Sequence, residues 1–258
     1  MTEAVLVSVD GGVGVLTLNR PDKFNCISTG LLDGLLAGMD RFEADSAVRA
    51  VLLNANGRQF CTGADLDEVL ERRKSAEALT PFIGAIHEAT RRFEDSPLPV
   101  VAAVQGLALA GGMELVVACD TVFAAESARI GCQHARYGLP PGGGGTQRLA
   151  RIVGLRRALD LMFTARWLDS AEAERWGLFN HVVPDGELDA RAQAYCADLA
   201  AKSRHGLAFM KGMARRGLEG PLDVGLALER GAVVAALQHS DVAEGLDAFQ
   251  NRREPVFP

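Results

Sequence analysis

Two glycine-bearing segments, each placed directly after a short apolar run, constrain the fold of this chain more than any other feature. Residues 57–66 (GRQFCTGADL) follow the apolar run 50–53, and residues 106–114 (GLALAGGME) follow the valine-rich run 100–104. Runs of this kind are typical of buried strands, and a helix that starts after each segment leaves its first backbone N–H groups without internal partners. Two such amides that converge on one point can bind an oxyanion beside the carboxylate of Glu114. Glycine loops before helices also serve close packing alone, so both interpretations stay open at this point.

The composition predicts a soluble, cytoplasmic protein with one catalytic domain and a modest appendage. A chain of 258 residues can bury one large core, and a net charge of −6 offers no basic stripe for nucleic acid. The five cysteines are scattered and odd in number, which is typical of free thiols in a reducing compartment. The start of the sequence lacks the features of a signal peptide, and no apolar stretch reaches the ~18 residues of a membrane span. We expect no nucleic-acid partner and no membrane association.

The N-terminal part of the sequence alternates strand and helix signals. Residues 6–9 and 13–18 alternate around Asp10-Gly11-Gly12, as in a hairpin. Ser28 or Thr29 can cap a helix, and Asp65 can start another. A further helix is expected over residues 80–93, because Pro97 and Pro99 follow it.

Helical patterning dominates the second half of the chain. Asp169 and Gly177 are expected to begin and end one helix. Three further helical stretches are expected at residues 187–202, 205–216 and 222–249. We therefore predict an α/β core over residues 1–195 and a helical C-terminal region over residues 196–258.

The motifs, in their order and spacing, resemble the crotonase (enoyl-CoA hydratase/isomerase) superfamily over nearly the whole chain. The residues that carry the resemblance are NRPDKFN at 19–25, GADL at 63–66, GLALAGGMEL at 106–115, CD at 119–120, PGGGGTQRL at 141–149, WLDSAE at 167–172, GL at 177–178, and EGLDAFQNR at 244–252.

This resemblance implies a spiral of ββα units with a helical C-terminal trimerisation region, assembled as a trimer or as a hexamer made of two trimers. It also implies an acyl-CoA substrate and no separate cofactor, since CoA is part of the substrate. The amides of Ala64 and Gly111 would form an oxyanion hole for the thioester oxygen. The residues expected to border the substrate are Lys23, Phe24, Asn25, Cys26, Asp65, Leu66 and Gly112.

The sequence departs from the hydratase pattern at one catalytic position. Relatives that hydrate enoyl-CoA carry two glutamates that hold the attacking water; Glu114 matches the first, and His134 stands at the second. A neutral imidazole can take a proton from water, and a desolvated Glu114 could protonate the α-carbon. The alternative is that His134 only fills a wall of the pocket.

Several functions remain open from the sequence. The leading interpretation is hydration of a 2-enoyl-CoA or the reverse dehydration; the alternatives are isomerisation, thioester or C–C hydrolysis, and a hydratase-lyase reaction. A non-catalytic binding or assembly protein is a further alternative, which the presence of Glu114 disfavours. We expect residues 65–73 and 80–93 to wall the acyl pocket, with Phe82 and Ile83 as lining residues. The other histidines lack ligand spacing, so no metal site is expected.

Overall fold

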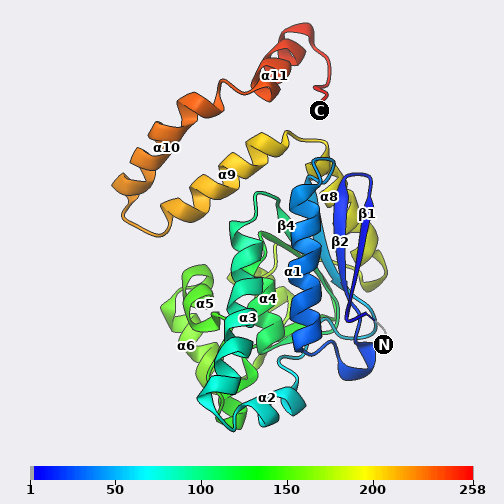
Figure 1. Ribbon diagram of the computed structural model, residues 1–258, viewed down its shortest axis with the longest axis vertical. Helices are drawn as coiled ribbons and strands as arrows, with labels where there is room; N and C mark the ends of the chain where they lie inside the picture. The colour runs from blue at the N-terminus through cyan, green and yellow to red at the C-terminus, as the bar shows by residue number, and fades with distance from the viewer. Residues whose placement is uncertain (1–2, 258) are drawn as a thin grey trace.

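The computed structural model describes residues 3–257 as two β-sheets with helices around them (Figure 1). The main sheet has the strand order β1-β2-β3-β4-β6-β9. Its strands are β1 (Val5–Asp10), β2 (Val13–Leu18), β3 (Ala50–Ala55), β4 (Val100–Val104), β6 (Thr121–Ala125) and β9 (His181–Val183). β1 and β2 form the predicted antiparallel hairpin, and all other neighbours in this sheet pair in parallel.

The chain also forms a second, smaller sheet of three strands. It has the order β5-β7-β8, with β5 (Leu107–Leu109), β7 (Arg129–Gly131) and β8 (Trp167–Asp169). Cys61 forms an isolated parallel bridge with Ala108 at its edge. The chain thus passes from the main sheet to the second sheet and then into a helix, once through β4, β5 and α4 (Gly111–Ala118) and again through β6 and β7. This repeated path is the expected spiral of ββα units.

The helices cover both sheets and extend beyond them. Besides α4, the helices before β9 are α1 (Thr29–Ala44), α2 (Leu66–Arg72), α3 (Ala76–Asp95), α5 (Gly145–Val153), α6 (Leu155–Thr164) and α7 (Ser170–Trp176). Those after it are α8 (Leu188–Ala200), α9 (Arg204–Gly217), α10 (Leu222–Ala236) and α11 (Ser240–Asn251). Short 3₁₀ segments are η1 (Pro21–Lys23), η2 (Gln133–Tyr137) and η3 (Asp185–Glu187).

The predicted helix ends are set by local side-chain caps. Ser28 caps α1, Asp65 caps α2 and Asp169 caps α7, each by accepting a hydrogen bond from a backbone N–H of the first turn. Gly177 ends α7 in the left-handed conformation, with φ of +80°. The helix predicted over residues 80–93 begins earlier, because Ser75 caps it at Ala76.

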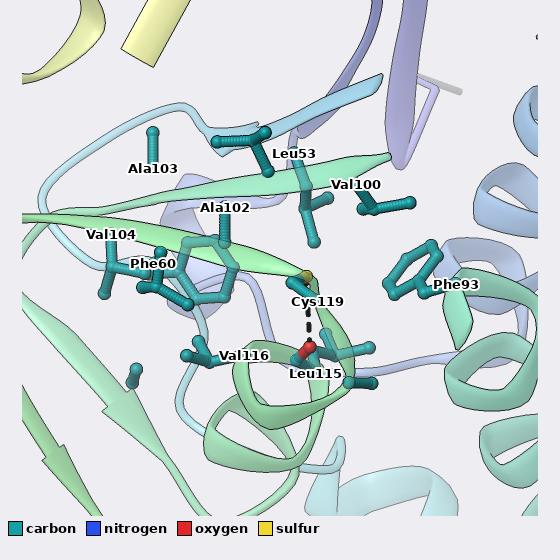
Figure 2. Close-up of a cluster of buried hydrophobic side chains, with 14 of the residues drawn as sticks. Leu53, Phe60, Phe93, Val100, Ala102, Ala103, Val104, Leu115, Val116 and Cys119 are labelled. Atoms are coloured by element: carbon teal, nitrogen blue, oxygen red, sulfur yellow. Dashed lines mark hydrogen bonds between the residues drawn. The ribbon is translucent and has the colours of Figure 1, made fainter. Parts of the chain in front are cut away.

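The core lies between the main sheet and α4. Figure 2 shows Leu53 and the β4 residues Val100, Ala102 and Val104 facing Phe60, Phe93, Leu115 and Val116, all of which are buried. Every residue of α4 is buried, so this helix is fixed from all sides. The predicted site residues at its N-terminus, Gly111 and Glu114, therefore stand on a rigid element.

The C-terminal helices α9, α10 and α11 project from the body of the molecule (Figure 1). No residue of α9 or α10 is buried. The single helical stretch predicted over residues 222–249 is wrong: the chain breaks between α10 and α11, because His239 caps α11 by accepting a hydrogen bond from the Asp241 amide. The predicted boundary at 195/196 lies within α8, which packs on β2, β3, β4 and β6.

Within residues 3–257, none of the helices combines the length and the apolar character needed to cross a membrane.

Candidate active site

The backbone amides of Ala64 and Gly111 lie side by side at the start of α4. A side-chain carbon placed on Gly111 would be 3.6 Å from the Ala64 nitrogen, and one placed on Gly63 would be 3.6 Å from the Gly111 nitrogen. Ile27 bonds to the residues on either side of Ala64, accepting from the Asp65 amide and donating to the Gly63 carbonyl, so the Ala64 N–H points away from it. Among the hydrogen bonds of residues 3–257, neither amide has an acceptor. Two backbone donors without an acceptor therefore lie close together, which an oxyanion site requires.

Backbone strain and glycine contacts hold these two amides together. Ala110 precedes α4 with φ of +50° and ψ of −117°, a conformation that costs an L-residue about 1–3 kcal/mol. Its N–H donates to the Gly131 carbonyl and its carbonyl accepts from Glu114, which fixes the turn. A side-chain carbon on Gly112 would be 2.0 Å from the Cys61 carbonyl oxygen. Gly112 is thus required for the close approach of the two segments.

Glu114 lies one turn into α4, with its carboxylate enclosed by the loop before α5. The residue is 2% exposed, and its Oε1 accepts hydrogen bonds from the amides of Gly143 and Gly145, each at 2.8 Å. Burial raises the pKa of Glu114, while the two amides and the Arg148 charge oppose this rise. Glu114 therefore holds a proton more readily than an exposed glutamate does.

His134 on η2 faces the other oxygen of Glu114. Its Nε2 is 4.0 Å from Glu114 Oε2, and its Nδ1 is 3.3 Å from the Cys132 sulfur. Burial lowers the pKa of His134, which keeps the imidazole neutral at pH 7. The Nε2–Oε2 distance exceeds a direct hydrogen bond but allows one water molecule to contact both atoms.

The loop predicted to border CoA is tightly folded beside Asp65. Asn25 is fully buried, and its amide group donates to the carbonyls of Asn56 and Gln59 and accepts from the Arg20 amide, so only its main chain can meet a ligand. Arg20 also donates to Asp65 at 2.8 Å, and Asp65 lies 3.5 Å from the Cys26 sulfur.

The other predicted CoA contacts differ in their exposure. Lys23 is exposed and lies 3.5 Å from Asp67, and Phe24 and Leu66 are exposed apolar side chains. Burial alone would raise the pKa of Asp65, but its bonds to Arg20 and the Asp67 amide outweigh it and lower the pKa. Asp65 is thus an ionised residue that organises the loop and caps α2.

An apolar cavity of about 370 Å³ opens beside His134. It is lined by Cys132, His134, Ala135, Leu139, Pro141, Thr146, Leu155, Leu159, Met162 and Phe163. Phe82, predicted to line the acyl pocket, is not among them: it is 2% exposed and lies under the Arg72 guanidinium, 5.2 Å from ring centroid to Cζ. Ile83 points toward Gly142 of the loop before α5. The cavity wall thus comes from α6, from residues 132–135 at η2, and from residues 139–146.

Sequence reasoning missed the contacts of the glycine run at residues 142–145. The partner of this run is Glu114, which lies 29 residues before Gly143. The glycine run at 142–145, with Arg148 three residues after it, is the signal that could have indicated these contacts. No group of three or more metal-ligating side chains occurs within the described residues.

Comparison with known proteins identifies the class to which this fold belongs. The enoyl-CoA hydratase of Bacillus anthracis superposes with a TM-score of 0.94 at 33% identity, covering 98% of both chains. An enoyl-CoA hydratase from Polaromonas also reaches a TM-score of 0.94, at 29% identity over 98% of this chain and 99% of that one. The fold is therefore the crotonase fold.

The sequence places the chain more closely. The profile of the family described as Enoyl-CoA hydratase/isomerase matches residues 8–258, so the chain belongs to that family. A Rhizobium meliloti protein named "Probable enoyl-CoA hydratase" is 38% identical over 99% of this chain and 98% of its own length. The human mitochondrial methylglutaconyl-CoA hydratase is 35% identical over 95% of this chain and 74% of its own length.

Proposed function

We propose that this protein hydrates a 2-enoyl-CoA to a 3-hydroxyacyl-CoA and catalyses the reverse dehydration. The observation that carries this function is the Glu114–His134 pair, whose Oε2 and Nε2 atoms are 4.0 Å apart. His134 lines the apolar cavity, and Glu114 lies in the first turn of α4, which begins at Gly111. Relatives named enoyl-CoA hydratase and methylglutaconyl-CoA hydratase support the same reaction class.

The two side chains divide the proton transfers between them. A water molecule held between His134 Nε2 and Glu114 Oε2 attacks the β-carbon of the enoyl group, and neutral His134 takes its proton. Glu114, whose pKa is raised by burial, donates a proton to the α-carbon. The His134 imidazolium then passes its proton to the Glu114 carboxylate, which restores the starting protonation states.

The amides of Ala64 and Gly111 stabilise the negative charge that develops on the thioester oxygen. The charge is largest in the enolate-like transition state, so these donors lower the barrier more than they strengthen substrate binding. Because the reaction consists of proton transfers and water addition, we propose that it uses no cofactor apart from the CoA of the substrate.

We propose that the acyl chain enters the cavity beside His134. The wall formed by Leu159, Met162 and Leu139 is apolar, and an alkyl chain that leaves water for it gains about 0.8 kcal/mol per methylene. Lys23, Phe24 and Leu66 lie near the loop expected to hold the CoA moiety, and their exposed side chains are free to contact it.

We propose that the chain assembles as a homotrimer or as a hexamer of two trimers, in the cytoplasm. Large apolar side chains on α9 and α10 are exposed, among them Met210 at 59% and Leu222 at 74%, which supports burial against further copies. The five cysteines are all free thiols, which fits a reducing compartment.

The test is turnover of crotonyl-CoA and longer 2-enoyl-CoA thioesters by the wild type, Glu114→Gln and His134→Ala. We expect the wild type to hydrate them and each variant to lose about 10²- to 10⁴-fold in kcat, the usual contribution of a positioned acid or base. The loss of absorbance of the conjugated thioester measures the rate.

The same assay separates the alternatives. Release of free CoA would indicate that the enzyme is a thioester hydrolase. A shifted double bond without added water would indicate that it is an isomerase. A wild-type kcat in the His134→Ala variant would show that His134 only lines the pocket and takes no part in proton transfer. A wild type that binds these thioesters and transforms none of them would refute the proposal.

A further inference from the structure

Each glycine in residues 143–145 makes room for a functional side chain. A side-chain carbon on Gly143 would be 2.8 Å from Glu114 Oε2, and one on Gly145 would be 3.0 Å from Glu114 Oε1. A carbon on Gly144, between them, would be 2.0 Å from Nη1 of Arg148, and Gly144 has a φ of +94°. The loop is therefore shaped on one side by Glu114 and on the other by Arg148.

Arg148 joins this loop to helix α3. Its Nη1 donates to the Gly143 carbonyl at 2.8 Å, while Nε and Nη2 donate to the two oxygens of Glu94 at 2.8 and 2.6 Å. The side chains of Arg148 and Glu94 are each 12% exposed. A bidentate ion pair in a mostly buried site has a fixed orientation, because the planar guanidinium matches the two oxygens of the carboxylate.

The same carboxylate is tied to the C-terminal helices. Glu94 Oε1 also lies 3.2 Å from Nη1 of Arg215 on α9, and Arg215 donates to Asp120 at 2.6 Å. Lys211, one turn earlier on α9, lies 2.7 Å from Asp120. Glu94, which holds Arg148, is thus itself held by α9, and α9 is fixed in turn by Asp120.

We propose that Arg148 is a positioning residue for the reaction: through the Gly143 carbonyl it holds the 143–145 loop so that the Gly143 and Gly145 amides grip Glu114 Oε1 and leave Oε2 facing His134. The proposal rests on the proposed function, in which Glu114 transfers a proton. Arg148 acts through the loop, since its nitrogens bond to Gly143 and Glu94 and not to Glu114.

Loss of Arg148 has a defined electrostatic consequence. The groups that face Glu114 are the amides of Gly143 and Gly145, the Arg148 charge, His134 and the buried Cys132 thiol. The two amides and Arg148 favour the carboxylate, so a loop released by removing Arg148 leaves burial less opposed. The pKa of Glu114 then rises further.

The test compares Arg148→Met with Arg148→Lys and with a matched control, Arg92→Met. Arg92, on α3, makes the same two-pronged bond to a glutamate, Glu43 on α1, at 2.9 Å for both prongs. Arg92 also pairs with Asp40 and its side chain is 33% exposed, so its removal costs an α3 ion pair that does not touch the loop. Arg148→Lys keeps the charge and one donor, so it should recover part of the function lost in Arg148→Met.

We expect Arg148→Met to lower kcat for enoyl-CoA hydration by about 10- to 100-fold with little change in KM, since a misplacement near 1 Å has that effect. The limb of the pH–rate profile that reports Glu114 should move to higher pH. Arg92→Met should show the wild-type profile. A wild-type kcat and pH profile in Arg148→Met would overturn the proposal.

A second readout does not depend on the reaction. In protein labelled with ¹³C at glutamate carboxyl groups, the Glu114 signal is assigned by its absence in Glu114→Gln. Its midpoint should rise in Arg148→Met, rise less in Arg148→Lys and stay unchanged in Arg92→Met. An unchanged midpoint in Arg148→Met would refute the positioning role even if the protein hydrates no enoyl-CoA, whereas failure of hydration alone would refute only the proposed function.

Discussion

At the scale of single residues, the site depends on glycines, which lack a side-chain carbon, as much as on its functional side chains. Gly112 lets the Cys61 carbonyl approach α4, and Gly143 and Gly145 let two amides reach Glu114. Ala110, by contrast, keeps a side chain in a conformation that glycine adopts without strain. Strain of this kind persists only where the surroundings fix the turn, here through Gly131 and Glu114.

Gly112→Ala should be much more costly than an alanine at an open glycine. The new carbon would be 2.0 Å from a backbone oxygen that cannot turn away, so we expect the free energy of unfolding to fall by about 3 kcal/mol or more, together with most of the activity. Gly84→Ala is the matched control: Gly84 is an exposed position of α3 with no atom within 4 Å of the new carbon. It should raise the unfolding free energy by about 0.5–1 kcal/mol. Urea unfolding of both variants measures the difference, and equal effects would contradict the close-approach argument.

At the scale of elements, α3 connects the site to the rest of the molecule. Its Glu94 meets Arg148 of α5 and Arg215 of α9. Burial alone would raise the pKa of Glu94, but the hydrogen bonds and charge of Arg148 and the charge of Arg215 lower it below the ordinary value of 4.5. The three helices are therefore joined by one carboxylate that stays ionised at neutral pH.

This ion pair should make part of the stability sensitive to acid. A carboxyl whose folded pKa is lowered stabilises the fold above its unfolded pKa and loses that contribution as the pH falls through the folded value. Glu94→Gln should therefore lower the unfolding free energy by about 2 kcal/mol near pH 7, because two arginines lose a buried partner. The gap between variant and wild type should narrow as the pH falls below about 4.5. Urea titrations from pH 7 to about 3 check this, and a gap that is independent of pH would assign the effect to packing.

At the scale of the whole molecule, the projecting helices leave an incomplete surface. Leu226 and Val234 of α10 are 53% and 62% exposed, and Phe249 of α11 is 83% exposed. Apolar exposure of this extent is typical of an interface between subunits. The body, in contrast, holds its large core around α4 and the main sheet.

Charges placed on this surface should dissociate the proposed assembly. Leu226→Asp combined with Val234→Asp would bury carboxylates at the interface, so we expect the trimer or hexamer to give way to monomers in light scattering after gel filtration. Leu6→Asp places the same charge at a partly exposed apolar position of β1 on the body and serves as the control. A wild type that is monomeric at all concentrations, or a double variant that stays assembled, would contradict the proposal.

Local signals made much of the fold predictable. The caps at Ser28, Asp65 and Asp169 act within a few residues, and the hairpin at Gly11-Gly12 depends only on its own turn. The break between α10 and α11 was missed, because a histidine cap at His239 is a weak signal beside continuous apolar periodicity. Phe82 is buried as its apolar character suggests, but it is not among the residues that line the cavity beside His134, because sequence does not say which side chains lie against a buried residue.

The sequence by itself determined the family, the alternation of strands and helices, and the identities of Glu114, His134, Ala64 and Gly111 as candidates, because these depend on motif order and on short-range backbone preferences. Only the tertiary structure decided that Glu114 is held by Gly143 and Gly145, that its free oxygen is 4.0 Å from His134, and that Arg148 connects this loop to Glu94. Apart from the bond between Arg148 and Gly143, these contacts join residues 20 to 54 positions apart. They form only when the spiral packs its separate turns together, so no local sequence pattern predicts them.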